Sequence, residues 1–186
     1  MDVRQRILTA AVDRLSTSGY SGMTISAVAA RAGLSRPTVY AHFGSREKLA
    51  SEALTLVSSR MLASVVEQVG ETTSAAEYLV ETMVSACAAF RAHPALAPLV
   101  QPQLGTVIVD GYLVDADSVG MARRFLSPLV AFRPDLEPDM DEIAETCIRF
   151  LVSIVQFDSS NTRTCDDLRR YLHRRLVPAV GLPPAP

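Results

Sequence analysis

Apolar residues recur at intervals of three and four positions along almost the whole chain of 186 residues. Residues 3–17 show this pattern, with Val3, Ile7, Ala11 and Leu15 on one stripe and charged residues away from it. The spacing is that of an amphipathic α-helix, whereas alternation with a period of two, the mark of a β-strand, is scarce. The sequence therefore predicts an all-α fold.

Capping residues and helix breakers set the expected boundaries of these helices. Thr24 and Ser35 can each cap the N-terminus of a short helix, and Gly33 and Gly44 follow the ends of the same two helices. Gly19 is expected to stop the first helix. We expect helices over residues 3–17, 25–32, 36–43, 45–69, 75–92, 116–132, 140–157 and 165–177, with an acidic, proline-containing linker at 135–139.

The composition excludes several classes of protein. Apolar residues make up 48% and charged residues 20%, so the chain can bury a core. No apolar run approaches the ~20 residues of a membrane span, and the charged N-terminus lacks the apolar region of a signal peptide. The cysteines, Cys87, Cys147 and Cys165, are odd in number and far apart, which argues against a disulfide framework. We therefore expect a cytoplasmic protein with no membrane association.

Charge is distributed unevenly along the chain. Residues 1–50 carry seven Arg and Lys against three Asp and Glu, whereas the rest of the chain carries 11 against 17. A basic segment joined to an acidic body is typical of a nucleic-acid-binding module fused to another domain. A bias of this size also arises by chance, so the charge alone leaves both interpretations open.

Two of the expected short helices are joined only by Gly33-Leu34-Ser35, the short glycine-containing turn of a helix-turn-helix unit. In such units the second helix enters the major groove of DNA, where its first turns meet base edges and phosphates. Arg36 can donate two hydrogen bonds to a guanine, and Thr38 offers a hydroxyl and a methyl group. Tyr40 and His42 can donate to phosphate oxygens. These residue types indicate DNA binding.

The segment from Thr24 to Leu49, TISAVAARAGLSRPTVYAHFGSREKL, resembles the DNA-binding signature of the tetracycline-repressor (TetR) family. The matching positions are Ala29, Ala32-Gly33, Ser35, Tyr40, His42-Phe43 and Lys48-Leu49, with Gly19-Tyr20 before them. The resemblance implies a bacterial, homodimeric transcription regulator, usually a repressor. Such a regulator binds a near-palindromic operator through its N-terminal domain and a small-molecule effector through a helical C-terminal domain.

The resemblance and the residue chemistry together assign parts of the chain. The expected domains are a three-helix DNA-binding domain at 1–48 and a helical regulatory domain, for ligand binding and dimerisation, at 49–180, followed by a tail at 181–186. The predicted DNA-binding residues are Thr24, Ser35, Arg36, Pro37, Thr38, Tyr40, Ala41, His42, Arg46 and Lys48. Base-contacting positions vary within the family, so these residues do not translate into an operator sequence.

The regulatory domain offers candidates for an effector pocket and for a dimer interface. Aromatic and methionine side chains that can line an apolar pocket are Met61, Tyr78, Met83, Phe90, Tyr112, Met121 and Phe125, although each also suits an ordinary core. The segment 140–157 is apolar on more than one face and must be buried within the domain or against a partner. The predicted interface residues are Ile143, Cys147, Phe150, Leu151, Ile154, Leu168, Tyr171, Leu172 and Leu176.

Other functions receive less support. An effector is expected to be apolar or aromatic, because no cluster of charge lies on an apolar face. The acidic group at 139–145 is interpreted as favouring the dipole of the helix it begins, rather than as a metal site. We expect no cofactor, no metal and no enzymatic activity. Two alternatives stay open: a helical enzyme that uses the C-terminal pocket, and an adaptor that has kept the fold and lost DNA binding.

Overall fold

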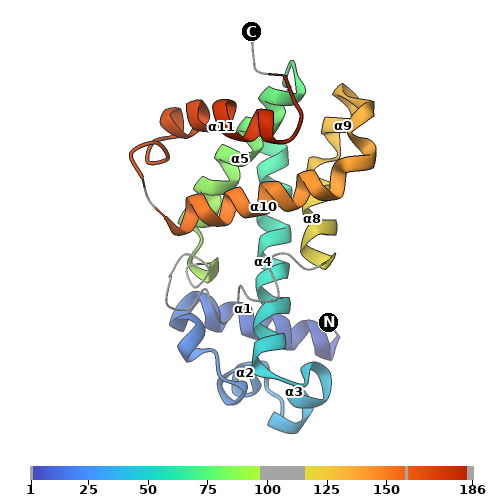
Figure 1. Cartoon of the computed structure of the whole chain (residues 1–186). Helices are drawn as coiled ribbons and strands as arrows, with labels where there is room; N and C mark the ends of the chain where they lie inside the picture. The colour runs from blue at the N-terminus through green and yellow to red at the C-terminus, as the bar shows by residue number, and fades with distance from the viewer. Residues whose placement is uncertain (1, 97–115, 158, 184–186) are drawn as a thin grey trace. The chain divides into compact units, whose positions relative to one another are not determined.

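The computed structural model describes residues 2–96, 116–157 and 159–183. Every regular element within these ranges is an α-helix or a short 3₁₀-helix (Figure 1). The prediction of an all-α fold is therefore confirmed. The described residues form two compact units, one made of residues 2–60 and 92–96 and the other of residues 61–91, 116–157 and 159–183.

The first unit is built from helices that follow each other closely along the chain. They are α1 (Val3–Gly22), α2 (Ile25–Ala32), α3 (Arg36–Phe43), the beginning of α4 (Arg46–Val69) and the 3₁₀-helix η1 (Pro94–Leu96). Helix α1 packs against α2 and η1, and α2 packs against α3. The core contains the apolar stripes of these helices, among them Ile7, Ala11 and Leu15 of α1, Val28 of α2, and Val39 and Phe43 of α3.

The second unit contains the remaining helices. They are the end of α4, α5 (Ala75–Ala92), α8 (Ala116–Leu126), α9 (Pro128–Phe132), the 3₁₀-helix η2 (Pro134–Asp139), α10 (Met140–Gln156) and α11 (Cys165–Ala179). Helix α10 packs against α8, η2 and α11. The core of the second unit includes Leu79 and Cys87 of α5, Leu129 of α9, Met140 of α10, and Leu172 and Leu176 of α11.

Three boundaries differ from those expected. Helix α1 runs on to Gly22, with Gly19 (φ 63°, ψ −174°) interrupting its regular backbone three residues before the end. The helix expected over 116–132 is divided into α8 and α9 at Pro128, because proline has no N–H to continue the ladder of α8. The expected linker at 135–139 is ordered as η2, which contains both Pro134 and Pro138.

Helix α4 contributes residues 46–60 to the first unit and residues 61–69 to the second. The predicted boundary at residue 48 stays a prediction. By length and composition alone, α4 is apolar enough to cross a membrane, with a mean hydropathy of 1.3 over an 18-residue window. Within the structure 39% of that window is buried, and Leu49, Ala53 and Leu54 are among the buried residues of α4.

Candidate nucleic-acid interface

Helices α2 and α3 form a helix-turn-helix unit that local hydrogen bonds define at each end. The Thr24 hydroxyl accepts a hydrogen bond from the Ala27 N–H (3.1 Å) and caps α2. Helix α2 ends at Gly33 in the left-handed conformation (φ 64°, ψ 41°), which glycine adopts without strain. The Ser35 hydroxyl accepts from the Thr38 N–H (3.2 Å) and caps α3. The predicted capping roles of Thr24 and Ser35 are confirmed.

Helix α3 has one buried and one exposed face. Val39 and Phe43 are buried in the first unit, whereas Arg36, Pro37, Ala41 and His42 are exposed. Tyr40 is 52% exposed, so this aromatic side chain is not part of the core that α3 forms with α2. The Thr38 hydroxyl is within hydrogen-bond distance of the Ser35 hydroxyl (2.8 Å). The exposed face of α3 therefore carries most of the side chains predicted to bind DNA.

Most of the basic residues of the first unit have partners inside that unit. Two of them form ion pairs, Arg4 with Glu52 and Arg31 with Asp13 (2.8 Å). Two others donate hydrogen bonds to backbone carbonyls, Arg6 to that of Ala32 (2.7 Å) and Arg14 to that of Gly22 (3.4 Å). The hydrogen bond from Arg31 holds the pKa of the Asp13 carboxyl below its usual value. Arg36 and Lys48 are exposed and have no such partner among the described residues. These two cations are therefore available to a ligand.

Arg46 has a different environment from the other predicted DNA contacts. Its Nε donates to the Met23 carbonyl (2.9 Å), and its Nη2 donates to the Tyr20 carbonyl. Its guanidinium carbon lies 4.2 Å from the centre of the Tyr20 ring. The neighbouring Glu47 accepts hydrogen bonds from its own N–H and from Ser45, which lowers the pKa of the Glu47 carboxyl. The first turn of α4 thus presents Lys48 outward and Arg46 toward its own unit.

Comparison with known proteins agrees with this geometry. Residues 7–53 match the family model described as bacterial regulatory proteins, tetR family. The N-terminal region of the chain is therefore similar to the TetR family. No curated protein matches it in sequence.

Several solved TetR-family structures share the fold over nearly the whole chain. The repressor AlkX from Dietzia sp. is 21% identical, with coverage of 95% of this chain and 96% of that chain and a TM-score of 0.68. The repressor QsdR from R. erythropolis is 13% identical, with coverage of 97% and 95% and a TM-score of 0.69. A TetR regulator from Rhodococcus sp. RHA1 is 18% identical, with coverage of 97% of each chain and a TM-score of 0.62.

Of the residues predicted to line an effector pocket, those that the structure describes lie in the second unit, on α4, α5 and α8. Tyr78, Met83, Phe90 and Met121 are buried, Met61 and Phe125 are partly exposed, and Tyr112 lies outside the described residues. The Tyr78 hydroxyl donates to the Phe125 carbonyl (2.8 Å), which joins α5 to α8. Burial raises the pKa of Tyr78. The pocket itself stays a prediction.

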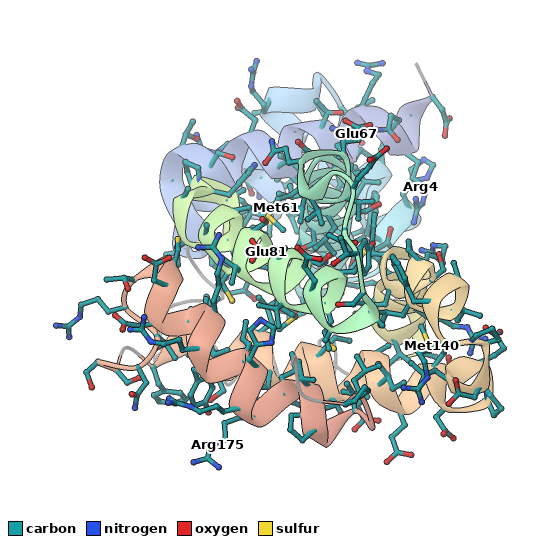
Figure 2. All side chains as sticks on the ribbon, turned by 90° about the horizontal axis from the view of Figure 1, so that it is seen from above. Arg4, Met61, Glu67, Glu81, Met140 and Arg175 are labelled. Atoms are coloured by element: carbon teal, nitrogen blue, oxygen red, sulfur yellow. The ribbon has the colours of Figure 1, made fainter. Side chains whose placement is uncertain are left out.

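The residues predicted to form the dimer interface divide into two groups. Six of them are buried within a single chain: Ile143, Cys147, Ile154, Leu168, Leu172 and Leu176. A side chain already covered in one chain has little surface to offer a partner, and the dimer interface itself stays a prediction. Phe150, Leu151 and Tyr171 stay partly exposed, and the Phe150 and Tyr171 rings lie 6.4 Å apart across α10 and α11. The outer face of α11 also carries Arg175, which points away from the unit (Figure 2).

The acidic group at 139–145 has a basic partner that its local sequence does not indicate. Arg123 of α8 donates to Glu137 (2.5 Å) and to Asp141 (2.9 Å), so it joins α8 to η2 and α10. These two ion pairs raise the pKa of Arg123. Asp141 is therefore tied to Arg123 in the structure, in addition to lying in the first turn of α10.

Proposed function

We propose that this protein is a dimeric, sequence-specific, DNA-binding transcription regulator that acts in the cytoplasm. Its most direct role is that of a repressor, released from a palindromic operator when a small apolar or aromatic ligand binds. The match of residues 7–53 to the tetR family model supports the coarser statement of a DNA-binding regulator. The observation that carries the proposal is an exposed surface made by the outer face of α3 and the start of α4. It presents Tyr40 and Arg36 on α3 and Lys48 on α4, and the two basic residues have no partner among the described residues.

In the proposed complex, α3 enters the major groove. Arg36 lies in the first turn of α3, where its guanidinium is placed to donate two hydrogen bonds to a guanine. The Tyr40 hydroxyl and the His42 ring donate to phosphates, and Lys48 adds a phosphate contact from the start of α4. Ala41 is small enough to let the backbone approach a thymine methyl. The proposed DNA-binding surface also includes four residues around the N-termini of α2 and α3, namely Thr24, Ser35, Pro37 and Thr38.

The palindromic operator follows from two-fold symmetry. Two copies related by a two-fold axis place their α3 helices in successive major grooves when these helices lie about 34–36 Å apart. For the dimer we propose contacts through Phe150, Leu151 and Tyr171, which are the members of the predicted set that keep exposed surface in one chain.

Release by a ligand requires that the ligand binds more tightly to a conformation unsuited to DNA. The described part of the second unit has buried methionine and aromatic side chains on α5 and α8, which favours an apolar ligand. Two similar structures are those of a repressor implicated in the biodegradation of n-alkanes and of a fatty acid degradation regulator. An apolar effector for this chain is in keeping with both.

The experiment that tests the proposal is selection of duplexes from a random library by the purified protein at about 150 mM salt, where non-specific phosphate binding is weak. We expect enrichment of an inverted repeat. A folded protein that enriches no sequence would contradict the proposal and favour the adaptor alternative.

A further inference from the structure

One side chain links the two ends of the helix-turn-helix unit. The unit begins at Thr24, which caps α2, and ends at Ser45, which follows α3. Arg46 comes directly after this unit and Met23 directly before it. The Arg46 Nε donates to the Met23 carbonyl over 2.9 Å, and a second guanidinium nitrogen donates to the Tyr20 carbonyl. A single guanidinium therefore holds both ends of the unit together.

The geometry points to Arg46 as a positioning residue for DNA binding, and not as a phosphate contact. This inference rests on the proposed function. The Met23 carbonyl belongs to the same planar peptide as the Thr24 N–H, so a hydrogen bond to that carbonyl fixes the plane from which Thr24 begins. Thr24 in turn caps α2 and is a predicted DNA contact. Arg46 thus acts on the interface through Met23 and Thr24.

The corner that Arg46 holds, residues 20–24, is also supported by the buried side chain of Met23 and by a hydrogen bond from Arg14 to the Gly22 carbonyl (3.4 Å). Gly19 (φ 63°, ψ −174°) interrupts α1 just before the corner, so the last turn of α1 is not continuous with the rest of the helix. Within the corner, the Met23 N–H donates to the Tyr20 carbonyl (3.1 Å) and the Thr24 N–H to the Gly22 carbonyl (3.1 Å). Arg46 adds the long-range hydrogen bonds that tie this corner to α4.

An arginine suits this position better than a lysine does. The two donating nitrogens of Arg46 lie in one plane and reach two carbonyls at once, while the flat face of the group covers the Tyr20 ring at 4.2 Å. A lysine ammonium keeps the charge but has neither the fixed fork nor the flat face. The substitution Arg46→Lys therefore separates the loss of geometry from the loss of charge.

The test compares Arg46→Lys with wild type on the duplex that the wild-type protein enriches from the random library. Affinity is measured between about 50 and 200 mM salt at a temperature where both proteins are fully folded. We expect Arg46→Lys to bind about tenfold more weakly, because fewer molecules hold the competent geometry. The slope of log affinity against log salt should stay unchanged, because the number of phosphate contacts is the same.

Two control variants calibrate this measurement. Arg31→Lys makes the same change at an exposed arginine of the same unit, paired with Asp13, and should leave affinity unchanged. Lys48→Ala removes a proposed phosphate contact from each subunit of the dimer and should reduce the magnitude of the salt slope by about 1.8, which is about 0.9 for each subunit. Hydrogen exchange at the Thr24 to Ala27 amides gives a readout without DNA, and we expect faster exchange in Arg46→Lys. The variant Tyr20→Leu, which removes the ring beneath Arg46, should show the same changes.

Other results would overturn the inference. Wild-type affinity in Arg46→Lys, together with a smaller salt slope in Arg46→Met, would identify Arg46 as a phosphate contact. A lower melting temperature with unchanged affinity of the folded protein would identify a purely structural role. If the wild-type protein binds no duplex, the proposed function fails, and Arg46 then has no role in DNA binding whatever the exchange rates show.

Discussion

Arg169 of α11 and Glu81 of α5 form a two-pronged ion pair across 88 positions of the chain. The Arg169 Nε lies 2.7 Å from Glu81 Oε1, and its Nη2 lies 3.0 Å from Oε2. Arg169 Nη1 also donates to Asp166 (2.9 Å), within α11. These contacts raise the pKa of Arg169, so it stays charged at every pH of interest. The pair links α11 to α5, on which Figure 2 labels Glu81.

We expect Glu81→Gln to lower the free energy of unfolding by about 1 kcal/mol. Both side chains are partly exposed, so solvent screens the pair, but the paired geometry places it at the upper end of the range for such ion pairs. The measurement is denaturation by urea. The matched control is Glu145→Gln, which breaks an exposed pair with Arg149 inside α10 and should cost clearly less. Equal losses in the two variants would show that the link between α5 and α11 adds nothing.

The three cysteines should differ sharply in reactivity. Burial raises the pKa of the Cys87 and Cys147 thiols to about 12, whereas Cys165 is exposed in the first turn of α11. Because the thiolate is the reactive form, a maleimide at pH 8 should label one thiol in the folded protein and all three in denaturant. The variant Cys165→Ser should take up no label until it unfolds. Rapid labelling of a second thiol in the folded state would contradict this assignment.

The same pKa shifts predict how stability depends on pH. The pKa of each buried thiol is raised from 9.0 in an unperturbed chain to about 12 in the fold. The contribution of the buried thiols to the free energy of unfolding is therefore fully present below pH 9, where the thiols are protonated in both the folded and the unfolded protein. It is lost as the pH rises toward 12, because the unfolded chain releases its protons first.

Arg36 and Lys48 should affect DNA binding in different ways. Arg36→Ala removes a base contact, so it should cost about 1–3 kcal/mol on the selected duplex and relax preference at one position of each half-site. Lys48→Ala should weaken binding to all duplexes alike. Competition between the selected duplex and single-base variants measures both effects. If Arg36→Ala left the preference at every position unchanged, Arg36 would not read a base.

Local features of this fold were predictable from the sequence, because short-range chemistry decides them. The caps at Thr24 and Ser35 and the end of α2 at Gly33 depend on residues within four positions of each other. The helix-turn-helix unit follows from these signals. The break between α8 and α9 at Pro128 also has a local cause. Because the helical spacing of apolar residues continues past Pro128, the sequence predicted a single helix over residues 116–132.

Long-range partners were not predictable in the same way. Arg46 looks in sequence like any other basic residue near the interface, and its hydrogen bonds to the Tyr20 and Met23 carbonyls depend on a contact over 23 positions or more. The burial of Leu168 and Leu172 within a single chain was not predictable for a related reason. Apolar residues that recur with helical spacing indicate which side of a helix is buried. The spacing does not show whether the same chain or a second copy covers that side.

The exposed remainder of the predicted interface yields the last prediction. Phe150, Leu151 and Tyr171 keep partial exposure on α10 and α11, so a charge introduced among them should oppose the proposed association of two copies. We expect Leu151→Arg to shift the protein from dimer to monomer in sedimentation at micromolar concentration. Each copy would then bury an unpaired charge at the interface, which is strongly unfavourable. The control is Phe132→Arg, at a residue of α9 that is 39% exposed and lies outside the predicted set. An unchanged dimer in Leu151→Arg, with its melting temperature preserved, would place the interface elsewhere on the chain.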